Sequence, residues 1–419
     1  MVANTAGEIF DLEGYAAVGM AGPALTPLTT RLARPIPHGS ELMFLPDRLP
    51  VVFDIASGEW VALRENPYAP GEPLFAVAAF NSPGYVITQL CCYEEMDGAG
   101  ILPLFSYGAV GWHGEGFYTA VMPVDRERRQ DLRLMPRAKV AAGVRHFQKQ
   151  MPRNQLRRHL EKCALQYGCP AAKNFFIGRC EAPLPTSPAC NARCLGCLSL
   201  QQGSPIPCSQ DRIDFTPAPE EIAEVALAHI ERVPDGVVSF GQGCEGDPLL
   251  AAGAIEPAIR LIRRQTDRGT VNLNTNASLP ETVGRLFDAG LDSMRVSINS
   301  LRADCYRAYF RPRGYTFADV MLSIDKILAG GGHVALNYLN LPGFTDTPEE
   351  FAALTAFLDE RPIHLIQWRN LNYDPMRYYA AMNAAAEHGT PMGMANLLKQ
   401  VKKRFPNLKH GYFNPALTR

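Results

Sequence analysis

The sequence predicts an α/β protein with three kinds of structure along the chain. Residues 181–375 alternate between short apolar runs and amphipathic segments, which is the pattern of parallel strands joined by crossover helices. Residues 1–137 carry apolar runs separated by Gly, Pro and Asn, which predicts a β-rich N-terminal domain. Residues 138–180 read as a basic helical linker, and residues 376–419 as a helical C-terminal extension.

Composition limits the class of protein. The 419 residues are 47% hydrophobic and 20% charged, as in globular proteins of two or three domains. The net charge of −1 implies no partner through bulk electrostatics. No apolar run approaches the ~20 residues of a membrane span, and no signal peptide is evident. Eleven cysteines then point to reduced thiols and metal ligation, so we expect a cytoplasmic protein with no membrane partner.

In the N-terminal region we expect strands at residues 41–45, 49–53, 74–80, 85–92, 101–105 and 117–124. Residues 125–162 then carry twelve Lys or Arg against four acids, with helical periodicity from 139 to 167 and a break at Pro152. A basic helical face can bind nucleic acid. Few aromatic residues interleave with the basic ones, so a linker helix packed on the next domain is the preferred interpretation.

The βα series is expected to contain six strands. The strand leading into residue 190 is followed by strands at 236–240, 270–274, 293–298, 333–339 and 363–368. The intervening helices are expected at 219–232, 255–266, 280–289, 317–329 and 347–359, and two more follow at 376–388 and 392–404. Ligands of such folds bind at the C-terminal ends of the strands.

Three cysteines follow the first of these strands at C-x3-C-x2-C spacing: Cys190, Cys194 and Cys197. Three thiolates on one tight loop can hold three irons of a [4Fe–4S] cluster and leave the fourth iron open. The alternatives are a zinc site or buried thiols without a ligand. Zinc normally takes four ligands, and no second pair with ordinary spacing completes such a set here.

The triplet resembles the signature of the radical S-adenosylmethionine (radical SAM) family. The resemblance implies a partial (β/α)6 TIM-like barrel over roughly residues 183–375. It also implies a [4Fe–4S] cluster whose open iron chelates SAM. Reductive cleavage of SAM then yields a 5′-deoxyadenosyl radical, which abstracts hydrogen from a substrate that the sequence does not identify. An electron donor such as flavodoxin or ferredoxin is implied as a partner. Gly196 departs from the family pattern, in which an aromatic residue precedes the third cysteine.

Further residues at strand ends resemble the SAM-binding positions of the family. The turn 241–248 is similar to its Gly-Gly-Glu-Pro motif, with Asp in place of Glu in Gly246-Asp247-Pro248. The polar turn after the third strand is equally consistent with capping side chains alone. We expect SAM contacts from Glu245, Gly246, Asp247, Thr275, Asn276, Ser297, Asn299, Asn337 and Arg369.

Two other functions stay open. One is a non-catalytic iron–sulfur or zinc binding protein, and the other is an RNA-modifying radical SAM enzyme that uses the basic helix. Four more cysteines crowd around the triplet, and a second cluster on them is not favoured because their spacing matches no ligand pattern. They are Cys163, Cys169, Cys180 and Cys208.

Overall fold

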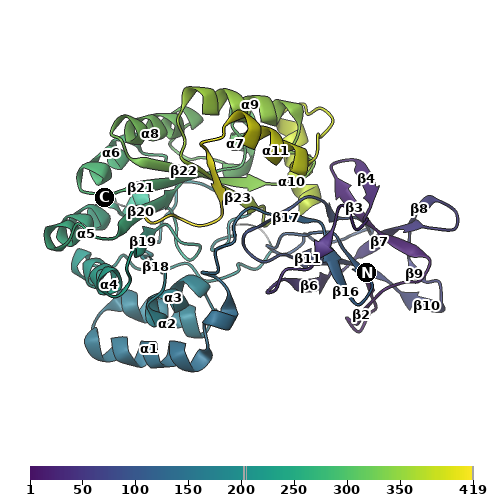
Figure 1. Cartoon of the computed structure of the whole chain (residues 1–419), viewed down its shortest axis with the longest axis horizontal. Coiled ribbons are helices and arrows are strands. Elements are labelled where there is room, and N and C mark those ends of the chain that lie inside the picture. Colours follow the sequence, from purple (N-terminus) through teal and green to yellow (C-terminus); the bar gives the residue numbers. More distant parts are fainter. Residues whose placement is uncertain (202, 204, 418–419) are drawn as a thin grey trace.

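The computed structural model describes residues 1–201, 203 and 205–417. A β-rich N-terminal region lies on one side and a curled parallel sheet covered by helices on the other (Figure 1). Residues 418–419 of the expected C-terminal extension lie outside the described residues. No helix among the described residues is long and apolar enough to cross a lipid bilayer.

The N-terminal region consists of short antiparallel strands in several small sheets. Its strands are β1 (Val2–Ala3), β2 (Ile9–Phe10), β3 (Tyr15–Ala21), β4 (Ala24–Pro27), β5 (Arg34–Pro35), β6 (Glu41–Phe44), β7 (Arg48–Asp54), β8 (Glu59–Ala62), β9 (Glu65–Asn66), β10 (Ala69–Pro73), β11 (Phe75–Phe80), β12 (Tyr85–Ile87), β13 (Leu90–Cys91), β14 (Tyr93–Glu95), β15 (Val110–His113), β16 (Gly116–Thr119) and β17 (Val121–Pro123).

The strand expected at residues 101–105 is wrong. These residues form a loop, although Leu102 and Leu104 are buried as the apolar pattern indicates. The backbone N–H of Leu102 donates to the Asp374 carboxylate at 3.0 Å rather than to a neighbouring strand. A side chain from the C-terminal part of the chain has therefore replaced the ladder partner that a strand would need.

Three helices connect the two parts: α1 (Arg137–Gln150), α2 (Gln155–Leu165) and α3 (Pro170–Ile177), preceded by the 3-10 turn η1 (Leu132–Leu134). The break lies where Pro152 predicts it, and the Asn154 side chain caps α2 by accepting from the N–H of Arg157. The ring of Phe147 on α1 stacks on that of Phe175 on α3, with centroids 4.5 Å apart. The helices pack against one another and, through α2, against α4 (Pro219–Arg232) of the sheet region.

The central sheet has seven parallel strands in sequence order. They are β18 (Glu181–Pro183), β19 (Val237–Phe240), β20 (Thr270–Thr275), β21 (Ser293–Ile298), β22 (His333–Asn340), β23 (Leu365–Asn370) and β24 (Lys409–Gly411). The covering elements are α4, η2 (Pro248–Ala251), α5 (Ala252–Gln265), α6 (Pro280–Asp288), α7 (Ala303–Phe310), α8 (Phe317–Ala329) and α9 (Pro348–Glu360), followed by α10 (Pro375–Ala385) and α11 (Met394–Arg404).

Two elements go beyond the expected six βα units. Strand β24 comes from the tail, where Lys409-His410-Gly411 has no apolar run to predict a strand, yet it pairs in parallel with β23. Helix α7 is an extra helix of eight residues between β21 and α8, and its C-cap residue, Arg311, has the left-handed conformation. The architecture is otherwise the expected partial TIM-like barrel with a β-rich N-terminal region and C-terminal helices.

The two sides of each strand differ in polarity. On β20, Val271 and Leu273 belong to the main hydrophobic core, whereas Asn272 and Asn274 hydrogen-bond to each other in the polar interior of the curled sheet. The same period of two places Arg295 and Ser297 of β21 on the interior side. The interior of the half-barrel is therefore polar, and the apolar core lies between the sheet and its outer helices.

A buried ion pair joins the N-terminal region to the barrel. Arg48 of β7 and Asp374, the N-cap of α10, are 2% and 0% exposed and lie 3.4 Å apart. Asn370, at the end of β23, adds a second link, because its side chain accepts from the N–H of Ile87 and donates to the carbonyl of Tyr85, both at 2.9 Å. The side-chain amide thus makes the two hydrogen bonds with β12 that the backbone of a neighbouring strand would make.

Candidate functional site

The loop that carries Cys190, Cys194 and Cys197 is tied by its backbone to the end of α7. The N–H of Arg193 donates to the carbonyl of Phe310 at 2.9 Å, and that of Leu195 donates to the carbonyl of Tyr309 at 3.0 Å. The loop follows β18, so the three cysteines lie beyond the C-terminal end of the first barrel strand. The fold thus places them where ligands bind in parallel β/α proteins.

Gly196 leaves room for aromatic side chains from elsewhere in the chain. A Cβ at this position would stand 2.9 Å from the carbonyl oxygen of Asn372, 3.0 Å from the hydroxyl of Tyr309 and 3.3 Å from Cβ of Tyr373. These are closer than real Cβ contacts allow without movement. Tyr309 and Tyr373 therefore cover the loop, and the missing aromatic residue at 196 does not leave it uncovered.

The thiols of the triplet are half-buried and line one cavity. Burial raises the pKa of Cys190 to about 11, with the Asp247 charge as a second cause. The pKa of Cys194 is raised well above its usual value by burial and by Cys190 and Cys197. Arg212 donates to Sγ of Cys197 at 3.5 Å. Thiols in such surroundings become thiolates only when a cation stabilises them.

A cavity of about 530 Å³ opens over the loop and is lined by all three cysteines. Four arginines also line it: Arg193, Arg212, Arg311 and Arg313. The three thiols on this one loop suit a cluster in which each cysteine binds a different iron.

The turn after β19 runs directly beside this loop. The N–H of Gly246 donates to the carbonyl of Ser187 at 2.6 Å, and that of Asp247 donates to the carbonyl of Ala189 at 2.9 Å. A Cβ at Gly246 would lie 1.9 Å from the Ala189 carbonyl oxygen, so only glycine fits. The turn that the sequence singled out is therefore joined by hydrogen bonds to the segment that enters the cysteine loop.

The Glu245 carboxylate is buried and accepts hydrogen bonds from the chain itself. It accepts from the backbone N–H groups of Thr186, Ser187 and Gln242 at 2.8, 3.0 and 2.7 Å, and from the Thr186 hydroxyl. Burial raises its pKa to about 7, although these N–H donors favour the charged form. Thr186 and Ser187 were not predicted as site residues, because they belong to no sequence motif and meet Glu245 only in the folded chain.

Asp247 connects this turn to the next strand. Its carboxylate accepts from the Thr275 hydroxyl at 2.8 Å and from the Asn276 backbone N–H at 2.7 Å. The Asn276 amide in turn donates to the side-chain oxygen of Asn191, inside the cysteine loop, at 2.8 Å. One continuous network thus holds three strand ends together, and Asn191 is a member that the sequence analysis did not select.

The remaining expected site residues separate into two places. Ser297 lies in the interior and accepts from the Asn337 amide at 3.3 Å. The buried side-chain oxygen of Asn337 has no partner in the part of the chain that the structure describes. Asn299, in contrast, is fully buried and donates to the carbonyl of Cys305 and the hydroxyl of Tyr378. It connects the end of β21 to α7 and α10.

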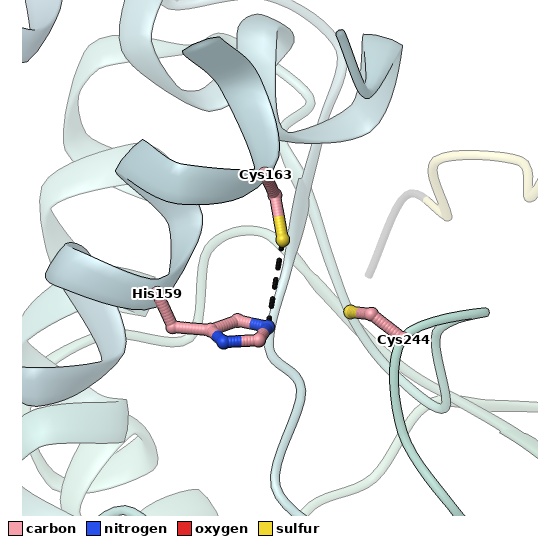
Figure 2. Close-up of side chains that lie close together, drawn as sticks. All are labelled: His159, Cys163 and Cys244. Atoms are coloured by element: carbon pink, nitrogen blue, oxygen red, sulfur yellow. Dashed lines mark hydrogen bonds between the residues drawn. The ribbon is translucent and has the colours of Figure 1, made fainter. Parts of the chain in front are cut away.

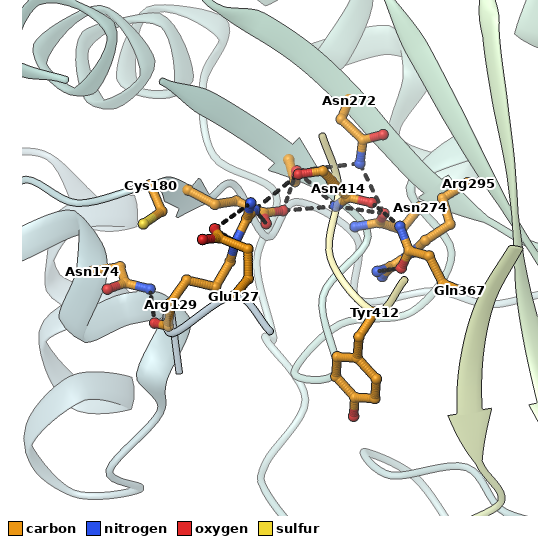
Figure 3. A network of polar contacts seen from close by, with 12 residues as sticks. Glu127, Arg129, Asn174, Cys180, Asn272, Asn274, Arg295, Gln367, Tyr412 and Asn414 are labelled. Carbon is orange, nitrogen blue, oxygen red and sulfur yellow. Dashed lines mark hydrogen bonds and ion pairs between the residues drawn. The ribbon is translucent and has the colours of Figure 1, made fainter. Parts of the chain in front are cut away.

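Arg369 lies in the interior beside the tail, where its guanidinium stands 3.8 Å above the Tyr412 ring. Figure 3 shows the tail crossing a polar network with Arg295 and Gln367 nearby. Asn414 accepts from Gln367 at 2.9 Å and donates to Glu181 at 2.8 Å. Nε of Arg295 and of Arg369 is buried and has no partner among the described residues.

The fold brings only two of the four additional cysteines together: the N–H of Cys169 donates to the carbonyl of Cys163 at 2.9 Å. Cys169 lies at the N-cap of α3, Cys180 precedes β18 and Cys208 is exposed. Among the described residues, Cys163 instead shares a group of possible metal ligands with His159 and Cys244. A second cluster on the four expected cysteines therefore has no support from their arrangement.

Comparison with known proteins agrees with this geometry. Residues 184–358, less than half of the chain, match the model of the radical SAM superfamily. Its members use a [4Fe–4S] cluster and SAM. The matched segment contains the cysteine loop and the turns after β19 and β20.

Individual relatives match only this part. GTP 3′,8-cyclase of Heliobacterium modesticaldum is 31% identical over 179 residues, which are 42% of this chain and 50% of that protein. FeMo cofactor biosynthesis protein NifB of Klebsiella pneumoniae is 26% identical over 181 residues, 39% of this chain and 38% of that protein. The matches thus span half or less of the length of these two relatives.

Among solved structures, a radical SAM methyltransferase from Sphaerobacter thermophilus superposes with a TM-score of 0.40 and 15% identity. The superposition covers 56% of this chain and 65% of that one.

Proposed function

We propose that this chain is a radical SAM enzyme in which Cys190, Cys194 and Cys197 hold a [4Fe–4S] cluster and the adjoining strand ends bind SAM. The single observation that carries the proposal is the connection of the cysteine loop to the turn after β19 through Ser187 and Ala189. This connection brings the thiol ligands and the turn 241–248, which resembles a SAM-binding motif, to one edge of a parallel sheet.

The residues present fit both groups. Three thiols on one loop leave one iron of a cluster without a protein ligand. Within the described part of the chain, Asn337 and Arg369 each carry a buried polar atom without a partner, and such atoms normally find a ligand or water. When bound, the cluster and SAM supply reductive cleavage of SAM and hydrogen abstraction from the substrate.

The protein's own residues hold and orient these groups. Gly246 lets the backbone approach the cysteine loop closely, and Asp247 holds the ends of β19 and β20 at a fixed separation through Thr275. Glu245 receives hydrogen bonds from the segment that precedes the loop. We therefore assign Glu245 and Asp247 the task of positioning the backbone that binds SAM, because their carboxylate oxygens already accept several donors each.

We assign the polar interior of the half-barrel to SAM and the substrate. Ser297, Asn337 and Arg369 line it, and Arg295 adds a second guanidinium. Burial and the neighbouring Arg369 lower the pKa of Arg295 to about 9. Two guanidinium groups in one buried space favour an anionic group between them, such as the carboxylate of SAM or an acidic substrate.

An acidic electron donor, such as flavodoxin or ferredoxin, fits the outer side of the loop. Arg193, Arg311 and Arg313 are exposed there, and positive charge at a cluster's surface steers an acidic partner toward it. We expect electrons to enter through this face.

RNA remains a second candidate substrate because α1 presents exposed Arg137, Lys139, Arg145 and Lys149. Other basic residues of the segment are engaged within the chain: Arg157 is buried against Glu161, and Lys162 pairs with Asp211. This pairing favours a packing role. Binding to bulk tRNA that falls steeply with salt would instead support RNA as substrate.

The proposal is tested by electron paramagnetic resonance of the reduced, anaerobically reconstituted protein. Addition of SAM should change the signal of the cluster, because SAM binds the open iron. The Cys190, Cys194, Cys197→Ala variant should lack the signal. A signal that SAM leaves unchanged would contradict the proposed site.

A further inference from the structure

A second set of possible metal ligands includes a residue of the turn that follows β19. His159 and Cys163 come from α2, and Cys244 comes from the turn after β19. One ligand atom from each residue lies within 4.8 Å of the other two. Figure 2 shows the Cys163 sulfur directed at the His159 ring, with the Cys244 sulfur facing both from the opposite chain segment.

Local structure explains why two of these ligands converge. His159 and Cys163 are four residues apart on α2, so their side chains lie on one face of the helix. Cys244 reaches them because α2 packs on α4 and because the carbonyl of Cys244 accepts from the Ile213 N–H at 2.8 Å. The spacing His-x3-Cys is visible in the sequence, whereas the third ligand depends on the fold.

The distances suit a single ion. In a tetrahedral site with Zn–S of ~2.3 Å and Zn–N of ~2.0 Å, sulfur and nitrogen ligands stand about 3.5 Å apart. Sγ of Cys163 and Nε2 of His159 are 3.5 Å apart. Ligand atoms this close together suit one ion rather than the wider spacing of an iron–sulfur cluster.

The charge and burial of the three ligands also favour a bound divalent cation. Cys163 and Cys244 are 2% and 6% exposed, so two thiolates here need a compensating cation. A divalent ion with two thiolates and a neutral imidazole has no net charge, which suits burial. Thiolate and imidazole together are ligands that zinc prefers over magnesium or calcium.

We propose that His159, Cys163 and Cys244 bind one zinc ion, separate from the site of the cysteine triplet. Binding replaces the thiol protons of Cys163 and Cys244, which pass to solvent. His159 also lines a cavity of about 740 Å³, together with Tyr167, Cys208 and Asp211, and water from this cavity can complete the coordination.

The ion would have a consequence for the main site. Cys244 directly precedes Glu245, whose carboxylate holds the segment that enters the cysteine loop. An ion bound by Cys244 and by the two ligands on α2 would hold this turn against α2. Metal binding is therefore expected to stabilise the full chain against unfolding, because the ion binds only the folded arrangement of the three ligands.

The first test is metal analysis of the full-length protein with its cluster reconstituted under reducing conditions. The expected result is about one zinc per chain for the wild type, as a single site requires. His159→Gln and Cys244→Ser should each lose the zinc and keep the iron. Cys92→Ala is the control, because Cys92 is also a buried thiol but lies in the N-terminal region.

The second test measures metal uptake directly, so that it also applies to protein that has lost its metal during purification. Chelator-treated protein is titrated with Co²⁺, which reports thiolate ligation by its absorption, and the melting temperature is followed as Zn²⁺ is added. Wild type and Cys92→Ala should show both the absorption and a higher melting temperature. His159→Gln tests the site mildly, since this side chain is only partly buried.

Three results would overturn the proposal. They are failure of the reduced wild type to take up zinc or cobalt, equal uptake by Cys244→Ser and wild type, and a Cys163–Cys244 disulfide that survives reduction and excludes metal. None of these results bears on SAM cleavage, so the zinc site can fail while the proposed function stands.

Discussion

The carboxylate of Asp247 accepts a hydrogen bond from the Thr275 hydroxyl at 2.8 Å and thereby joins the ends of two neighbouring parallel strands. A second bond, from the Asn276 N–H at 2.7 Å, extends the connection toward Asn191 in the cysteine loop. The geometry of the turn after β19 therefore depends on this buried carboxylate. Its replacement should disturb SAM binding without removing any ligand of the cluster.

Asp247→Ala is expected to weaken SAM binding about 10- to 100-fold, since losing buried hydrogen bonds to a charged group costs ~1.5–3 kcal/mol. Thr275→Val should have a smaller effect, because the Asn276 N–H bond remains. Equilibrium binding of SAM to reconstituted protein measures both. Asp288→Ala, on the exposed end of α6, is the matched control. Unchanged affinity in Asp247→Ala would show that the turn does not hold SAM.

Glu245 should give the protein a specific pH dependence of stability. Burial raises its pKa in the folded state to about 7, from 4.5. The folded protein therefore binds more protons than the unfolded chain between these values, and this group's contribution falls as pH rises from about 4.5 to about 7. The loss is at most about 3 kcal/mol, as a shift of this size implies.

Denaturant unfolding of wild type and Glu245→Gln at several pH values isolates this contribution. The difference between the two free energies of unfolding should change across the window from about 4.5 to 7 and stay constant above it. Glu350, also buried with a raised pKa, is unaltered in both proteins and cancels in the comparison. A difference that does not vary with pH would mean that Glu245 is ionised throughout the window.

Gly196 should tolerate no side chain, because Tyr309 and Asn372 already occupy the space. Gly196→Ala is expected to destabilise the protein by ~1–3 kcal/mol, as other overpacked sites do, and to lower the iron content. Adding Tyr309→Phe removes one of the two closest atoms and should restore part of the loss.

Gly253→Ala is the control for that pair, since nothing lies within 4 Å of a Cβ there and Ala favours the helix. Thermal unfolding and iron analysis are the measurements. Equal iron content and melting temperature in Gly196→Ala and wild type would refute the close packing described around the cysteine loop.

Arg193 and Arg313 should govern electron delivery by an acidic donor. Their backbones are held by Phe310 and Asn191, while both residues are exposed. Arg193→Gln with Arg313→Gln is expected to raise the KM for reduced flavodoxin several-fold and to weaken its salt dependence. Cleavage of SAM with dithionite as reductant should stay the same. A loss of equal size with both reductants would place these arginines in the SAM site instead.

Much of the barrel could be predicted because its strands carry a clear signal. In β20 the apolar Val271 and Leu273 alternate with Asn272 and Asn274, and the cysteine triplet and the glycine turn lie close to their strand ends in sequence. Strand β24 has no such signal, since its three residues pair with β23, from which a helix-containing segment separates them along the chain. Local patterns determine local structure, and β24 depends on a long-range contact.

The site shows the same division. Cys190, Cys194 and Cys197 are close in sequence, so their chemistry is readable from spacing. Thr186, Asn191 and Tyr309 acquire their roles from hydrogen bonds and packing that link separate segments. Cys244 shows the limit most clearly, because it is distant in sequence from His159 and Cys163 and joins them only in the folded chain.

The central claim is that the cysteine triplet holds the cluster that cleaves SAM. The most direct measurement is release of 5′-deoxyadenosine by anaerobically reconstituted, dithionite-reduced protein. The account predicts release by the wild type and by Cys92→Ala, and none by the variant in which Cys190, Cys194 and Cys197 are all Ala. Release by the triple variant at the rate of the wild type, or no release by wild-type protein with a full complement of iron, would contradict it.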